Sequence, residues 1–157
     1  MLTCFQIERA VNGKRLNVRV GIVVSQFNKE VSDVMKTSCV EKLITLGVNA
    51  DDISCVEVPG ALEIPIALDA LAKSGKFESL IALGSVIRGD TYHFEIVSNE
   101  SARGIMTVQL ETGIPIANGV LTCENSNQVE KRMERKAGQC AEVAIDMKNL
   151  LDLLNER

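Results

Sequence analysis

The chain has 157 residues, a length that predicts one domain over 1–157, and 46% of them are hydrophobic, enough for a sizeable core. A formal net charge of −4, no tryptophan and one tyrosine argue against a nucleic-acid-binding surface, which needs basic and aromatic side chains. No apolar run reaches the roughly 18–20 residues of a membrane span, and the first residues lack the apolar centre of a signal peptide. We therefore expect a cytoplasmic protein that binds neither nucleic acid nor membranes.

The cysteines predict free thiols. They are odd in number, none forms a Cys-x-x-Cys pair, and most fall within apolar stretches. This pattern favours buried thiols in a reducing compartment over a disulfide framework or a zinc site. The residues are Cys4, Cys39, Cys55, Cys123 and Cys140.

Strand and helix patterns alternate along the first half of the chain. The run Val18–Ser25 is nearly continuous and β-branched, which is typical of a strand buried on both faces. From Lys29 the apolar residues recur at helical spacing until Gly47, which stands where a helix commonly ends. Ile53–Val58 is the next predicted strand, and a helix over Ala61–Lys73 follows it.

The alternation continues in the second half. Leu80–Val86 is a third buried strand, and a loop then leads into a helix from about Tyr92 to Glu111. Pro115–Thr122 is the last predicted strand. One long helix closes the chain, with Arg132 on its early part and an apolar stripe through Cys140, Ala144, Met147, Leu151 and Leu154.

This order indicates an α/β fold with a mostly parallel four-stranded sheet and helices on both faces. The residues before Val18, with Asn-Gly-Lys at 12–14, are expected to form an N-terminal arm. In such sheets ligands bind beyond the carboxyl ends of the strands. That rule selects the connections 25–28, 59–63, 84–93 and 122–126 as the candidate site.

The glycines do not form a familiar phosphate-binding loop. The chain has neither G-x-x-x-x-G-K-[ST] nor G-x-G-x-x-G, the usual signatures of nucleoside-triphosphate and dinucleotide enzymes. The segment 84–89 carries a glycine at each end and is expected to bend tightly and offer backbone groups to a ligand.

Three side chains in or near these connections carry chemistry. His93 is the only histidine, and an imidazole near a strand end is suited to proton transfer at neutral pH, the alternative being an exposed histidine without a role. The Arg132 guanidinium is suited to a phosphate, although a charged residue in a charged helix is usually only solvated. Phe27 stands at a loop where no core pattern requires an aromatic, so either it stacks on a flat heterocycle or it packs on a neighbour.

Glu63 begins a predicted helix after Pro59-Gly60. A carboxylate there is favoured by the helix dipole whatever else it does. It is also placed to accept hydrogen bonds from a polar ring, while the backbone N–H groups of Ala61 and Leu62 are candidate donors.

Taken together, these connections resemble the lumazine synthase family. The resemblance runs in register over about residues 18–147 and includes Arg132. It is carried by SQFN at 25–28, VPGALEIP at 58–65, ALGSVIRGDTYHF at 82–94 and GVLTCEN at 119–125.

The resemblance implies an enzyme of the penultimate step of riboflavin biosynthesis. The family condenses 5-amino-6-(D-ribitylamino)uracil with 3,4-dihydroxy-2-butanone 4-phosphate, releasing phosphate and water without a metal or cofactor. It also implies a three-layer α/β/α fold of the flavodoxin-like kind. The expected assembly is a homo-oligomer, either a pentamer or a shell of pentamers, with riboflavin synthase as a candidate partner.

The resemblance further implies roles for individual residues. His93 corresponds to the proton-transfer residue, Arg132 to the anchor of the phosphate, and Phe27 to the aromatic that stacks on the pyrimidine ring. Asn118 corresponds to a position that lines the active site of an adjacent subunit. The other implied substrate-binding residues are Ala61, Leu62, Glu63, Ser85, Val86 and Ile87 for the ring and ribityl chain, and Asp90 and Thr91 near the phosphate.

The segment 133–141 departs from the family pattern. The linker before Cys140 is shorter than in many members, and a second family lysine has no obvious counterpart, with Lys131 and Lys136 as the candidates to replace it. Two other functions remain compatible with the sequence. They are a flavin- or lumazine-binding module and a riboflavin synthase on the same scaffold.

Overall fold

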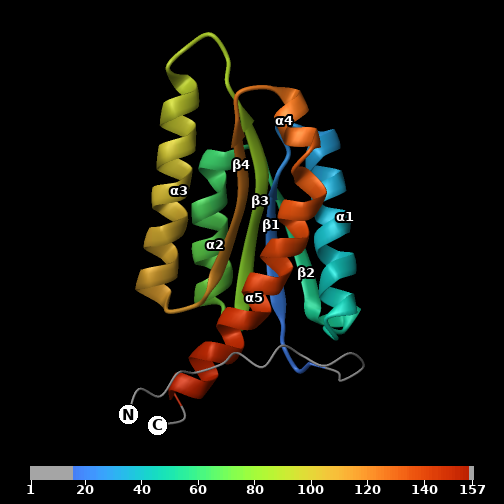
Figure 1. The fold of residues 1–157 in the computed structure, drawn as a ribbon. Helices are drawn as coiled ribbons and strands as arrows, with labels where there is room; N and C mark the ends of the chain where they lie inside the picture. The colour runs from blue at the N-terminus through green and yellow to red at the C-terminus, as the bar shows by residue number, and fades with distance from the viewer. Residues whose placement is uncertain (1–15, 156–157) are drawn as a thin grey trace, which may run out of the picture.

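A four-stranded sheet lies between two layers of helices (Figure 1). The computed structural model describes residues 16–155. The strands are β1 (Val20–Ser25), β2 (Ile53–Val58), β3 (Ser79–Ile87) and β4 (Ile116–Cys123), in the order β2-β1-β3-β4. Every neighbouring pair is parallel. The predicted three-layer fold with a mostly parallel sheet is confirmed: the sheet is parallel throughout, and its order is that of flavodoxin-like sheets.

The helices divide between the two faces (Figure 1). The long helices α1 (Lys29–Thr45) and α5 (Met133–Asn155) pack together on one face, where the short α4 (Ser126–Glu130) precedes α5. The helices α2 (Ile64–Lys73) and α3 (His93–Thr112) cover the other face. Two short 3-10 turns complete the described elements: η1 (Ala50–Asp52) and η2 (Ala61–Glu63).

The burial of each strand follows from its place in the sheet. β1 is central and all six of its residues are buried, as its continuous apolar run predicts. β2 is an edge strand and leaves Ser54, Cys55 and Glu57 exposed. Helix α1 ends where expected, since Gly47 has a φ of 101°, a left-handed conformation that suits glycine.

Three predictions about the elements need correction or fall outside the structure. The predicted helix over 61–73 begins as the separate 3-10 turn η2. The predicted last helix is divided into α4 and α5, so that Arg132 lies between them instead of on a helix, and the shortened segment at 139–140 lies inside α5. Apart from residues 16–17, the predicted N-terminal arm lies outside the described residues.

None of the helices within residues 16–155 is both long enough and apolar enough to cross a bilayer. The cysteines of this part of the chain are free thiols, with Cys39, Cys123 and Cys140 buried and Cys55 exposed on the edge strand. Burial raises the pKa of the Cys39 thiol to about 12, so this side chain stays protonated and behaves as a small apolar core residue.

Candidate active site

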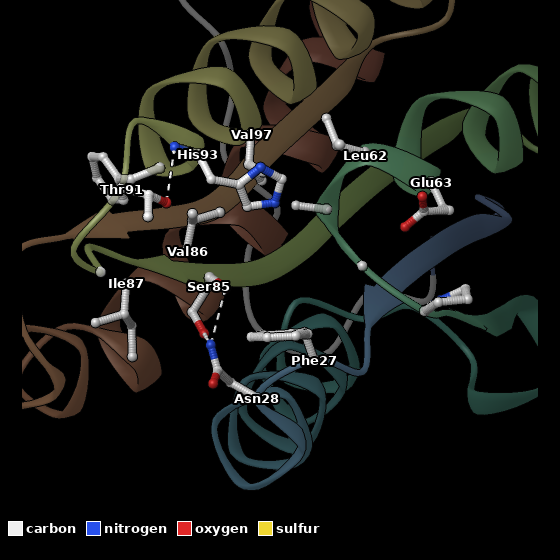
Figure 2. A pocket seen from close by; sticks show the side chains of 15 residues that line it. Phe27, Asn28, Leu62, Glu63, Ser85, Val86, Ile87, Thr91, His93 and Val97 are labelled. Carbon is white, nitrogen blue, oxygen red and sulfur yellow. Dashed lines mark hydrogen bonds between the residues drawn. The ribbon is translucent and has the colours of Figure 1, made fainter.

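A cavity of about 540 Å³ opens at the carboxyl ends of β1 and β3 (Figure 2). These strands mark the point where the chain order of the sheet reverses, which is where open α/β sheets form a binding crevice. The walls come from the β1–α1 turn, the segment through η2, the end of β3 and the start of α3. Most of the predicted site residues line this cavity: Phe27, Ala61, Leu62, Glu63, Ser85, Val86, Ile87, Thr91 and His93.

The turn after β1 presents Phe27 to the cavity. The amide Nδ2 of Asn28 donates hydrogen bonds to the Ser85 backbone oxygen (3.2 Å) and to Ser85 Oγ (3.0 Å), which ties the turn to β3 (Figure 2). The Phe27 ring is 84% exposed and lines the cavity, so it is not a core side chain. An exposed ring held by a fixed turn is suited to stacking on a flat ligand.

The turn η2 forms a second wall. Gly60 is extended, and the backbone N–H of Glu63 donates to the Gly60 oxygen at 3.2 Å. A Cβ on Gly60 would lie 2.9 Å from Glu63 Oε2, so the glycine leaves room for the carboxylate beside the cavity. Leu62 adds an exposed apolar surface next to it.

His93 opens helix α3, and its imidazole reaches into the cavity near Val97 and Val86 (Figure 2). Its backbone N–H donates to Thr91 Oγ1 at 3.4 Å. Thr91 makes this contact from the loop before α3, although the capping position itself is held by Tyr92. Among the described residues no side chain hydrogen-bonds the imidazole, so both ring nitrogens are open to a ligand.

Arg132, Asp90 and Asn118 do not line the cavity of their own chain. Arg132 lies between α4 and α5, where its Nη1 donates to the Gln128 backbone oxygen at 2.8 Å. Asn118 is exposed on the edge strand β4, and its Oδ1 accepts from the Val120 N–H at 3.0 Å. Asp90 is exposed in the β3–α3 loop.

The cavity also contains residues that were not predicted. Asn28 follows the loop aromatic directly, and Val97 lies four residues after His93, one helical turn along the same face of α3. That spacing was a usable signal for Val97. Phe94 lines the cavity as well, although nothing in its local sequence separates it from a core aromatic. Pro59, Gly60 and Gly89 complete the lining and belong to the connections selected from the sequence.

Comparisons with known proteins agree on one family. Residues 17–152 match the family model described as 6,7-dimethyl-8-ribityllumazine synthase. A protein of that name from Azoarcus sp. (strain BH72) is 53% identical over 149 residues, covering 95% of this chain and 94% of the relative. The relative of the same name from Methylobacillus flagellatus is 55% identical over 144 residues, covering 92% and 95%. One from Nitrosospira multiformis is 52% identical over 151 residues, covering 96% and 93%. The resemblance seen in the sequence is confirmed, and the chain belongs to the 6,7-dimethyl-8-ribityllumazine synthase family.

Proposed function

We propose that this chain condenses 5-amino-6-(D-ribitylamino)uracil with 3,4-dihydroxy-2-butanone 4-phosphate to give 6,7-dimethyl-8-ribityllumazine, in the cavity beyond β1 and β3. One observation carries the proposal beyond family membership. An exposed aromatic ring and the only imidazole of the chain face the same cavity, at the switch point of the sheet. The cavity of about 540 Å³ is within the usual range for small-molecule sites.

The main chemical task of the protein in this reaction is to transfer protons. The aromatic amine attacks a carbonyl, phosphate leaves, and the ring closes with loss of water. Each of these steps moves a proton that His93 is placed to accept or donate, because its ring nitrogens have no partner among residues 16–155. Much of the acceleration would come from holding both substrates together, since effective molarities reach about 10⁵ M and more in model reactions.

The direct test incubates the purified chain with both substrates and follows the fluorescent lumazine together with released phosphate. Stoichiometric appearance of both products supports the proposal. A riboflavin synthase would instead consume added lumazine and form riboflavin, and a flavin-binding module would retain a yellow ligand without turnover. Either of those outcomes would replace the proposed function.

Replacement of Phe27 tests the stacking role. Phe27→Ala should raise the KM for the pyrimidine about 10-fold, because a stacked pair of aromatic rings is worth roughly 0.5–1.5 kcal/mol beyond the area it covers. Phe27→Trp should keep a KM close to that of the parent chain, since any flat ring can stack. Steady-state kinetics with the butanone phosphate saturating measures both. A Trp variant as impaired as the Ala variant would contradict stacking.

We further propose that the active form is a homo-oligomer, a pentamer or a shell of pentamers, with Asn118 and Arg132 completing the pocket of a neighbouring subunit. Both residues lie outside the cavity of their own chain. Exposed apolar side chains on α2, α3 and α5 suit an interface between copies: Ile66, Ile96, Met106, Leu110, Leu153 and Leu154.

A mixing experiment tests the shared pocket. With the butanone phosphate well below its KM, His93→Ala and Arg132→Ala chains should each be weakly active. Oligomers assembled from an equal mixture should regain about a quarter of the parent activity, since random order pairs an intact His93 with an intact neighbouring Arg132 at that frequency. Native mass spectrometry of each preparation gives the subunit number. An active monomer, or a mixture no better than its components, would contradict the shared pocket.

We also propose a cytoplasmic location and a functional link to riboflavin synthase. The buried thiols Cys39, Cys123 and Cys140 are free, which suits a reducing compartment. Riboflavin synthase is the natural partner because it consumes lumazine, the product proposed for this chain.

A further inference from the structure

Arg88 connects three elements around the β3–α3 loop, which borders the active-site cavity. It follows β3 directly, and its backbone N–H donates to the Cys123 oxygen at the end of β4 (2.9 Å). Its guanidinium Nε donates to Glu124 Oε2 at 2.7 Å, just beyond β4. Its Nη1 pairs with Glu95 Oε1 in the first turn of α3.

The same guanidinium lies over the ring of Phe94, with Cζ 4.2 Å from the ring centroid. Phe94 lines the cavity and follows His93, whereas Arg88 does not line the cavity itself. The turn 89–92, which carries Thr91, therefore begins directly after Arg88. It ends directly before the first turn of α3, where Arg88 contacts Phe94 and Glu95.

The contacts of Arg88 are suited to fixing the relative positions of the β3–α3 loop and its neighbours more than to stabilising the fold. The side chains of Arg88, Glu95 and Glu124 are 37%, 30% and 57% exposed, and exposed ion pairs contribute little to stability on their own. A planar guanidinium with donors in fixed directions nevertheless restricts where its partners lie. The hydrogen bond from Arg88 also lowers the pKa of the Glu95 carboxyl, so the pair remains charged at neutral pH.

We propose that Arg88 is a positioning residue for the condensation: by joining β3, the end of β4 and the first turn of α3, it fixes the turn that carries Thr91 and the helix start that carries His93. This inference rests on the proposed role of His93. It assigns Arg88 no contact with the substrates, and its removal should therefore affect turnover more than binding of the pyrimidine.

The kinetic test compares Arg88→Gln with a matched control. Arg19 is also an exposed arginine whose guanidinium is paired with a carboxylate, that of Glu78, beside β1 and β3 at their amino ends and away from the cavity. Arg88→Gln should lower kcat about 10- to 100-fold, since a misplacement of about 1 Å costs on that order, while the KM for the pyrimidine stays within about twofold. Arg19→Gln should keep the parent kcat. Equal kcat in the two variants would overturn the proposal.

Two milder variants separate geometry from charge. Arg88→Lys keeps the charge but loses the planar fork and the contact over Phe94, so it should recover only part of kcat. Glu124→Gln weakens only the contact between Arg88 and the end of β4, so it should lower kcat less than Arg88→Gln does. Full activity in Arg88→Lys would assign the effect to charge and overturn positioning by the guanidinium.

A second readout does not depend on activity. Because the chain has one histidine, isotope labelling of histidine Cε1 gives a single imidazole NMR signal per subunit. Arg88→Gln should shift or broaden this signal, and Arg19→Gln should leave it unchanged. An unmoved signal would overturn the inference even if turnover fell. If Arg88→Gln shifts the signal but the His93→Ala variant keeps its activity, the positioning by Arg88 is upheld and the proposed role of His93 is refuted.

Discussion

His93→Ala is expected to lower kcat by about 10²- to 10⁴-fold, the usual contribution of a positioned acid or base. The imidazole faces the cavity, and no other histidine in the chain can replace it. The side chain is exposed and makes no hydrogen bond to the described residues, so its loss should leave folding and the KM of both substrates nearly unchanged. Single-turnover measurement of lumazine formation isolates this step from product release.

Tyr92→Phe is the control for this experiment. Tyr92 precedes His93, is 72% exposed and does not line the cavity, so the variant should turn over like the parent chain. The pH dependence of kcat gives a second comparison, because loss of a general acid–base group should change the profile. A His93→Ala chain with the parent kcat and profile would refute the acid–base role.

Arg132→Ala is expected to raise the KM for the butanone phosphate by about 10- to 150-fold, equivalent to the roughly 1.5–3 kcal/mol of a charge-assisted hydrogen bond. Its present hydrogen bond, to the Gln128 backbone oxygen, uses Nη1 and leaves the rest of the guanidinium for an anion. The KM for the pyrimidine should change little, because that substrate carries no phosphate. Inhibition by inorganic phosphate should weaken in parallel.

Arg135 provides the matched control for Arg132. It is an exposed arginine in the first turn of α5, three residues further along the chain. Arg135→Ala should leave both KM values unchanged, which separates a specific anchor from the general loss of positive charge near the pocket. A rise of equal size for both substrates in Arg132→Ala would show that the residue supports the structure of the α4–α5 junction instead.

The sequence by itself determined the order of the elements and the loops that form the cavity. The strand β1 could be predicted because its apolar residues are consecutive. The end of α1 could be predicted because glycine readily adopts the left-handed conformation found at Gly47. Phe27 and His93 could also be selected from the sequence. Each is an unusual residue in a connection that a parallel sheet places at one edge.

Only the tertiary structure decided which side chains meet across the sheet. Asn28 contacts Ser85 over 57 positions, and Arg88 contacts Glu124 over 36, distances at which no periodic pattern carries information. The break between α4 and α5 was hidden because both segments have helix-compatible composition, and only packing decides where a chain turns. For that reason Arg132 was predicted on a helix and lies instead at a junction outside its own cavity. The sequence shows which residue stands in a loop, but the direction in which its side chain points depends on the elements packed around it.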